Sequence, residues 1–281
     1  MKNIKRGLSC LILLLVYVLS FVAGWIISGC INLKICSSLL VADVAATVIV
    51  FVFSVFFGNA SVYDPYWSVQ PLVFVTGAAV AHGVNLLGVL ILIAIWFWGL
   101  RLTANWAYTF HGLGHQDWRY TMLKEKSGWF YPVVNFFGIH MIPTLVVYCC
   151  MRPAIRMIED GCAFRPLSLI GIVISLGAAT MQGIADIQMH SFKKNGGTGF
   201  IRVGLWKYGR HPNYLGEIMM WWGVALTWLL SSPDLSNWPL MISGAVFNTC
   251  LFLFISIPLA EKHQARKSGF AEYKKETRLF I

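Results

Sequence analysis

Long apolar runs constrain the fold of this chain more than any other feature. The hydrocarbon core of a bilayer is about 30 Å thick, so a helix needs about 20 apolar residues to cross it. Eight runs reach or approach that length, at residues 8–27, 39–57, 71–82, 86–108, 129–151, 167–187, 214–230 and 238–259. The sequence therefore predicts an all-α, multi-pass transmembrane helix bundle. We expect eight spans, or seven if the short run at 71–82 does not cross.

Composition excludes an ordinary soluble domain. Hydrophobic residues make up 57% of the chain and charged residues only 12%, whereas soluble domains carry about 25% charged residues. No internal repeat, low-complexity tract or linker divides the sequence. We interpret residues 1–281 as a single integral-membrane domain.

The basic residues indicate the topology. If the N-terminus is cytoplasmic, 17 of the 22 Lys and Arg residues fall in cytoplasmic segments and only four lie in connections on the other side. This bias is the positive-inside pattern of an even number of spans with both termini in the cytoplasm. The net charge of +10 then follows from topology and from contact with anionic membrane lipids, and requires no nucleic acid. We expect the inner membrane if the source is bacterial and the endoplasmic reticulum if it is eukaryotic.

The densest polar motif, GLWKYGRHPNYLGE, covers residues 204–217 and leads directly into an apolar run. Pro212 suits the first turn of a helix, so a helix is expected to begin there. Asn213 and Glu217 then share one helical face near the positive end of the helix dipole, and Arg210 adds a cation. A carboxylate one turn into an apolar helix is unfavourable unless it binds something. The alternative is a membrane-surface anchor with Glu217 paired internally.

Other polar residues converge on the same predicted side of the membrane. Arg101 lies near the inner end of the fourth run, and Asp186 lies near the inner end of the sixth with Gln182 one turn above it. Arg101 has an alternative role, because an arginine near a helix end often extends to the lipid headgroups. An aspartate is not stabilised by reaching the lipid headgroups, and it is unfavourable at the negative end of a helix dipole. We therefore expect Asp186 to have a function. The remaining members are Asp64 at the start of the third run, Asp117, Arg119 and Tyr120 in the loop after the fourth, and Glu261 at the end of the eighth, before a basic tail that contains Tyr273.

A cationic loop lies between the helix that carries Asp186 and the polar motif at residues 204–217. Lys193 and Arg202 flank a glycine-rich stretch at 196–199, which leaves room for a large anionic cofactor. His111 and His115 are four residues apart, but the glycines between them predict a loop and no third ligand is visible. We therefore expect no metal site.

In combination, these motifs resemble the steroid 5α-reductase superfamily, and most closely its branch of largely uncharacterised multi-span membrane proteins. The resemblance covers most of the chain after residue 60. It implies an NADPH site open to the cytoplasm, mainly within 180–281, and a substrate cavity mainly within 39–150. The residues that carry it are Asp64 with Trp67, 101–106, 117–120, 185–188, 205–217 and 261–280.

The resemblance also implies roles for individual residues in holding NADPH. Asn213 and Glu217 match positions near the nicotinamide, and Arg202 suits the phosphates. The expected cofactor-binding residues are Gln182, Asp186, Lys193, Arg202, Arg210, His211, Asn213, Tyr214, Glu217, Glu261 and Tyr273.

The expected chemistry is reduction of a C=C bond conjugated to a carbonyl. Steroid reductases hold the substrate carbonyl with a Glu and a Tyr on early helices; here Asp64 takes the place of the Glu, whereas Trp98 stands at the Tyr position. Negative charge develops on the carbonyl oxygen, so a donor is needed there. We assign that role to Tyr120, supported by Arg101 or a protonated Asp64. The expected substrate is lipophilic and enters from the bilayer, and no obligate protein partner is expected.

Two other functions remain open. Arg-His-Pro followed by a glutamate also occurs in membrane methyltransferases similar to the isoprenylcysteine carboxyl methyltransferases, which use S-adenosylmethionine. A non-enzymatic lipid-binding membrane protein is the third possibility. The extended match over 205–217, together with Asp186 and residues 101–106, favours an NADPH-dependent oxidoreductase acting on CH–CH groups.

Overall fold

The computed structural model describes residues 5–281, and the regular elements in this part of the chain are helices, which confirms the all-α prediction. The long helices are α1 (Arg6–Gly29), α2 (Ile35–Phe57), α3 (Tyr66–His82), α4 (Leu86–Thr109), α7 (Ile142–Glu159), α8 (Leu169–Lys194), α9 (Pro212–Ser231) and α10 (Trp238–Leu251). The shorter helices are α5 (Trp118–Ser127), α6 (Tyr131–Val133), α11 (Ile257–Gln264) and α12 (Phe270–Glu276). Short 3-10 helices lie at Ala60–Tyr63, Gly128–Phe130, Pro166–Ser168 and Gly204–Lys207, and π-helical segments at Val134–Met141 and Phe252–Ser256.

Six of the eight apolar runs coincide with one long helix each. The run at 129–151 covers α6, the π-helical segment Val134–Met141 and the first half of α7, and the run at 238–259 covers α10, the π-helical segment Phe252–Ser256 and the start of α11. Within residues 5–281, six helical segments are long and apolar enough to cross a membrane by length and composition, and α3, with 17 residues, and α9 are not among them. The chain is therefore an integral membrane protein by these criteria. Eight crossings stay a prediction.

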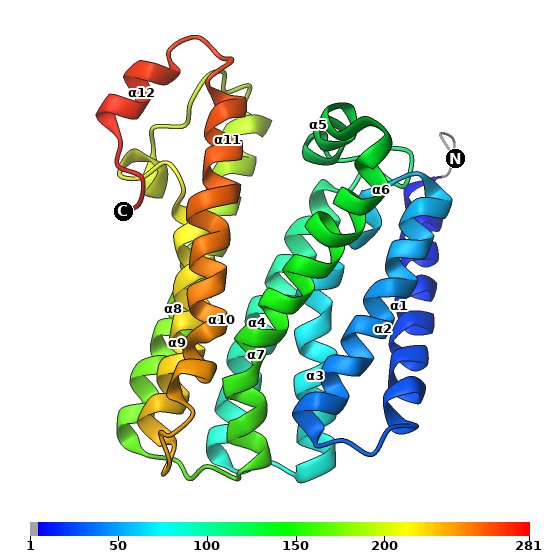
Figure 1. The fold of residues 1–281 in the computed structure, drawn as a ribbon. Coiled ribbons are helices and arrows are strands. Elements are labelled where there is room, and N and C mark those ends of the chain that lie inside the picture. Colours follow the sequence, from blue (N-terminus) through cyan, green and yellow to red (C-terminus); the bar gives the residue numbers. More distant parts are fainter. Residues whose placement is uncertain (1–4) are drawn as a thin grey trace.

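Consecutive long helices run in alternating directions (Figure 1). The start of α1, the connections at 58–65, 110–117 and 195–211, and the segment after α11 therefore gather at one end of the bundle. These are the segments that the charge pattern assigns to one side of the membrane. Which side that is stays a prediction.

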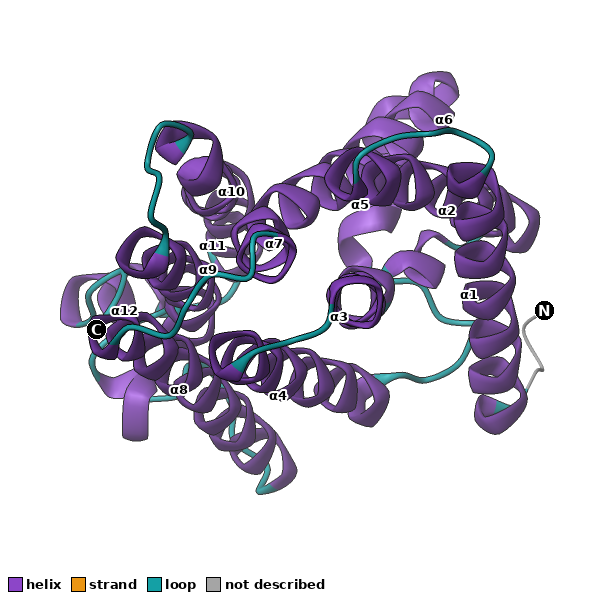
Figure 2. Cartoon of the chain, turned by 90° about the horizontal axis from the view of Figure 1, so that it is seen from below, coloured by secondary structure: helices purple, strands orange, loops and turns teal. Residues whose placement is uncertain are grey.

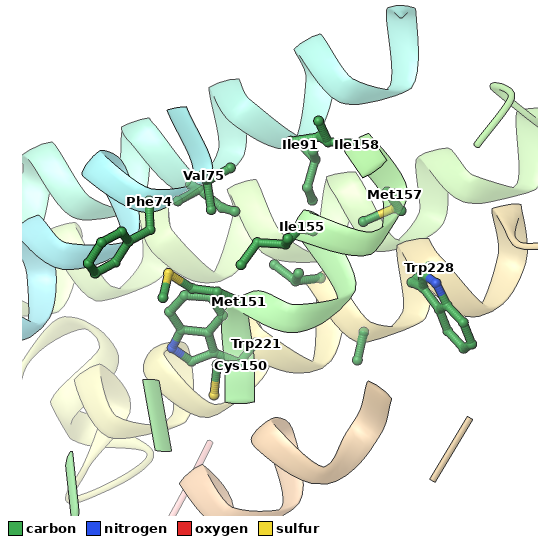
Figure 3. Close-up of a cluster of buried hydrophobic side chains, with 14 of the residues drawn as sticks. Phe74, Val75, Ile91, Cys150, Met151, Ile155, Met157, Ile158, Trp221 and Trp228 are labelled. Carbon is green, nitrogen blue, oxygen red and sulfur yellow. The ribbon is translucent and has the colours of Figure 1, made fainter. Parts of the chain in front are cut away.

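Helix α7 lies at the centre of the bundle, between α3 and α4 on one side and α9 and α10 on the other (Figure 2). Its fully buried Met151 and Ile155 belong to one cluster with Val75 of α3, Ile91 of α4 and Trp221 of α9 (Figure 3). Lipid tails are as apolar as these side chains, so close packing rather than water exclusion holds such helices together. This cluster fixes the spacing of the helices that carry the polar motifs.

A buried polar network that the sequence analysis did not single out joins α2, α3 and α7. Asp43 of α2 is fully buried, and its carboxylate accepts hydrogen bonds from the Tyr66 hydroxyl (3.0 Å) and from Gln70 Nε2. Thr47, one turn along α2, contacts Thr144 of α7 at 3.1 Å between hydroxyl oxygens. A carboxylate inside a membrane helix requires such partners, and here they tie the amino-terminal helices to α7.

Helices α8 and α9 approach each other through small residues. A Cβ atom on Gly223 of α9 would lie 2.7 Å from the carbonyl oxygen of Gly171 on α8, closer than a methyl group fits. Glycine lets the two backbones touch, as in other small-residue contacts between membrane helices. This contact sets the distance between Gln182 on α8 and Glu217 on α9.

We predict that Gly223→Ala lowers the free energy of unfolding by about 1–3 kcal/mol, the usual effect of overpacking. A Cβ atom on Gly177, on the exposed side of α8, would meet nothing within 4 Å, so Gly177→Ala should leave stability unchanged or raise it slightly. Thermal unfolding of both variants in the same detergent measures the difference. Equal losses in the two variants would contradict the tight α8–α9 contact.

Candidate active site

A cavity of about 720 Å³ opens at the end of the bundle where the polar connections gather. Its size suits a small-molecule or cofactor site. Residues from both 39–150 and 180–281 line it, so the two regions expected for substrate and cofactor share one space. The predicted site residues among its lining are Asp64, Tyr120, Gln182, Asp186, Asn213, Tyr214 and Glu217.

Glu217 is the most buried of these groups, with 2% of its surface exposed. One carboxylate oxygen accepts hydrogen bonds from Trp98 Nε1 at 2.8 Å and Gln182 Nε2 at 2.6 Å, and the other accepts from Trp221 Nε1 at 2.9 Å. A carboxylate has about four acceptor positions, so three donors leave about one for a ligand. Within residues 5–281 Glu217 forms no ion pair and is held by these internal hydrogen bonds, which the membrane-surface anchor would also show.

Arg101 of α4 points into the bundle rather than toward the headgroups. Its Nη1 forms an ion pair with Asp186 at 2.9 Å, and its Nη2 donates to Gln182 Oε1. Its Nε is buried and has no hydrogen-bond partner within residues 5–281. Gln182 thus connects Glu217 to the Arg101–Asp186 ion pair. Its amide nitrogen donates to Glu217, and its carbonyl oxygen accepts from Arg101.

The surroundings of Asp186 differ from the sequence expectation in one respect. Helix α8 continues to Lys194, so Asp186 lies two turns inside the helix and not at its negative end. The ion pair with Arg101 accounts for its position instead. The spacing of Gln182 and Asp186 on one face of α8, predicted from sequence, is confirmed by their shared contact with this guanidinium.

Helix α9 begins at Pro212, as predicted. Asn213 and Tyr214 in its first turn line the cavity beside Glu217, which follows one turn later. The Tyr214 ring stacks on His211 with 5.2 Å between centroids and packs against Phe252 at 4.9 Å. The start of α9 therefore presents an amide and a phenol to the same space.

Tyr120 and Asp64 form a direct pair on the opposite side of the cavity. The Tyr120 hydroxyl donates to Asp64 Oδ1 at 2.6 Å. Tyr120 lies on a helix, α5, rather than in the loop expected from sequence. Asp117 caps that helix by accepting from the Arg119 backbone N–H at 2.8 Å. The charged residues at 117–119 thus begin a helix that places Tyr120 over Asp64.

Burial raises the pKa of Asp64 from its ordinary value of 3.8 to about 6, although the charge of Arg119 and the hydrogen bond from Tyr120 lower it. The carboxyl group therefore exchanges its proton close to neutral pH. A shifted carboxyl in a cavity, hydrogen-bonded to a tyrosine, is typical of a functional site.

Arg210 and Glu261 lie outside the cavity lining and join the C-terminal segment to the connection before α9. Arg210 Nε contacts Glu261 Oε1 at 2.8 Å, and Nη1 donates to the carbonyl oxygens of Lys274, at 3.3 Å, and Thr277. Burial lowers the pKa of His211 to about 4, so its 3.5 Å contact with Glu261 is not an ion pair at neutral pH. A cofactor role for these residues stays a prediction.

The other predicted cofactor residues also lie away from the cavity lining. Tyr273 of α12 is buried and stacks on Phe200, with ring centroids 4.8 Å apart. Arg202 is exposed and pairs with Glu276. Lys193 is exposed in the last turn of α8. The three side chains therefore stay predictions as cofactor contacts.

The sequence analysis missed the two indoles that hold Glu217. Sequence reasoning places Trp98 only at the position of a family tyrosine, yet its N–H points to the glutamate. Trp221 lies four residues after Glu217, a spacing that places both on one helical face. That four-residue spacing was the sequence signal from which the contact between Trp221 and Glu217 could have been predicted. The contact between Asn105 Oδ1 and His190 Nε2, at 2.7 Å, had no such signal.

Comparison with curated proteins finds distant relatives. An uncharacterised protein of Schizosaccharomyces pombe is 25% identical over 66% of this chain and 62% of its own length. The 3-oxo-5-alpha-steroid 4-dehydrogenases 1 of Macaca fascicularis and Homo sapiens are each 32% identical over 43% of this chain, which is 43% and 44% of their respective lengths. The matches thus span less than two thirds of each relative.

No solved structure matches the chain. The DUF1295 family, described as a protein family of unknown function, matches residues 50–277. This match includes all the cavity residues named above and agrees with the resemblance expected from the motifs. The chain therefore belongs to the DUF1295 family, a steroid 5α-reductase-like family of membrane proteins.

Proposed function

We propose that the protein is an NADPH-dependent membrane reductase that saturates a C=C bond conjugated to a carbonyl in a lipophilic, steroid-like or other substrate. One observation carries this proposal. A single cavity is lined both by a buried carboxylate with an acceptor position to spare, Glu217, and by a tyrosine paired with a titratable carboxyl, Tyr120 and Asp64. The similarity to 3-oxo-5-alpha-steroid 4-dehydrogenases supports it.

The polar side of the cavity suits NADPH in its donors and acceptors. The remaining acceptor position of Glu217 fits an N–H of the nicotinamide carboxamide. The Asn213 amide, which also lines the cavity, both donates and accepts. Lys193, in the last turn of α8, and Arg202, in the loop after it, lie outside the cavity lining and would meet the phosphates. These residues hold and orient the cofactor in the proposal.

When bound, NADPH supplies a hydride to the β-carbon of the conjugated system. The chain contributes a proton and a hydrogen bond. Tyr120 donates to the carbonyl oxygen, where negative charge develops, and protonated Asp64 donates in turn to the Tyr120 oxygen. Asp64 thereby keeps the phenol proton directed at the substrate and replaces it after transfer. The enol formed in this way becomes the saturated ketone when its α-carbon takes up a proton from water and its oxygen releases one.

The remaining wall of the cavity is apolar and is formed by α7 and α10 with their π-helical segments. A lipophilic substrate that is dissolved in the bilayer suits this wall, and surrounding lipids are its source. The proposal requires no protein partner and no nucleic acid.

We predict that NADPH raises the melting temperature of the purified protein and that S-adenosylmethionine does not. Asn213→Ala should weaken NADPH binding by about 2- to 10-fold, as expected for one lost hydrogen bond. Asn237→Ala, at an exposed position at the other end of the bundle, is the matched control and should leave affinity unchanged. Binding of S-adenosylmethionine instead of NADPH would favour the methyltransferase.

A second prediction concerns the proton donor. Tyr120→Phe should reduce turnover of a lipophilic enone by about 10²- to 10³-fold, with NADPH affinity nearly unchanged, because the lost hydrogen bond strengthens only as charge develops. Tyr131→Phe is the control, since the Tyr131 hydroxyl has no partner in the described chain and Tyr131 does not line the cavity. Unchanged turnover in Tyr120→Phe would remove Tyr120 from the mechanism.

The third prediction follows from the raised pKa of Asp64, about 6. The protonated form is the active one, so turnover should be highest below about pH 6 and should fall by about tenfold per pH unit above it. Asp64→Asn cannot exchange a proton, and its lower turnover should not depend on pH in this range. Initial rates between about pH 5 and pH 8 test both. A profile that rises with pH, or that survives in Asp64→Asn, would exclude this role.

A further inference from the structure

We infer that Asn248 of α10 binds an oxygen atom of the lipophilic ligand at the end away from the reacting carbonyl. The ligand class is then a lipophilic molecule with two separated oxygen functions. This inference rests on the proposed function for the presence of an enone, and it adds a specificity-determining residue that the proposal above does not use.

The first observation is an unpartnered buried amide. Asn248 is 4% exposed, lines the cavity, and its Nδ2 has no hydrogen-bond partner within residues 5–281. Leaving a buried donor unpaired is unfavourable, because the donor has lost its hydrogen bond to water. An acceptor oxygen on a bound molecule would satisfy it.

The second observation is the apolar surface that leads to this amide. Successive cavity-lining residues after Asn248 fall at three- and four-residue spacing on one face of α10, the π-helical segment and α11, and Ser256 is the other polar residue on that face. The apolar members of this stripe are Leu251, Phe252, Ile255, Leu259 and Ala260. The facing residues of α7 and the segment before it are Ile139, Pro143, Val146 and Val147. An apolar molecule fits between these stripes with its oxygen at Asn248.

The third observation is that two residues lining this part of the cavity also reach the outer surface of the bundle. Gly138 and Ile255 line the cavity and are also exposed, with 56% of the Ile255 surface accessible. They belong to the two π-helical segments, Val134–Met141 and Phe252–Ser256, and such segments occur often at functional sites. Both residues lie within predicted membrane spans, so we expect lipid rather than water outside this part of the cavity.

Helices α7 and α10 are in direct backbone contact one turn before Asn248. A Cβ on Gly244 of α10 would lie 2.5 Å from the carbonyl oxygen of Cys149 on α7, so the two backbones touch there. Asn248 lies one turn above this contact, where the helices begin to part. It therefore marks the floor of the apolar groove.

The test compares two enones that differ only in the distal oxygen, androst-4-ene-3,17-dione and androst-4-en-3-one. Equilibrium binding to the full-length protein in nanodiscs, without NADPH, should favour the dione by about 3- to 10-fold, the range of one hydrogen bond. Asn248→Leu should abolish this preference. Ser243→Ala, on the same helix, should retain it, because the Ser243 hydroxyl donates to the Leu240 carbonyl oxygen and Ser243 does not line the cavity.

Several outcomes would overturn the inference. Equal binding of the two probes to the wild-type protein would do so whether or not the variant folds, and so would failure of both probes to bind. A preserved preference in Asn248→Leu would also exclude Asn248. Because binding is measured without cofactor, a protein that prefers the dione but shows no reduction would refute the proposed reductase and leave the Asn248 site standing. Reduction of both enones with equal binding of the two would support the proposed reductase and exclude the Asn248 site.

Discussion

The buried carboxylate of Glu217 is the interaction on which the site depends. A charge in an apolar bundle is stable only when donors surround it, and the three donors come from three helices: Trp98 on α4, Gln182 on α8 and Trp221 on α9 itself. Gln182 can donate to Glu217 only in the orientation in which its carbonyl oxygen faces Arg101. The Arg101 guanidinium donates to that oxygen and so holds the amide in place. The polar half of the cavity is thus held in place by its own hydrogen bonds.

The two halves of the cavity are built by different means. On the polar side, hydrogen bonds and glycine contacts bring α4, α8 and α9 close together, which fixes the groups that are proposed to hold the cofactor. On the apolar side, α7 and α10 touch at Gly244 and then part through π-helical turns. A polar wall held by hydrogen bonds opposite an apolar wall suits the proposed reaction between a soluble cofactor and a membrane-dissolved substrate.

The fold and part of the site could be predicted from sequence because their signals are local. Apolar runs predicted the helices, Pro212 predicted the start of α9, and a four-residue spacing placed Gln182 beside Asp186. Contacts between distant segments had no such signal: Trp98 and Glu217 are 119 residues apart. Asp43 and Asn248 are isolated polar residues within apolar runs, and their burial and partners depend on the neighbouring helices. The prediction of a loop at α5 was wrong because the polar composition of this helix carries no apolar periodicity.

The contacts of Arg210 impose an order on assembly. Its partners, Glu261 and the carbonyl oxygens of Lys274 and Thr277, are all synthesised at least 51 residues later. A nascent chain that has inserted α9 therefore has an uncompensated cation at the membrane surface until the C-terminal segment emerges and folds back. The apolar wall is complete once α10, the π-helical segment after it and α11 have formed, whereas the contacts of Arg210 form last. The C-terminal segment is therefore the last part of the chain to join this end of the bundle, after the apolar wall is in place.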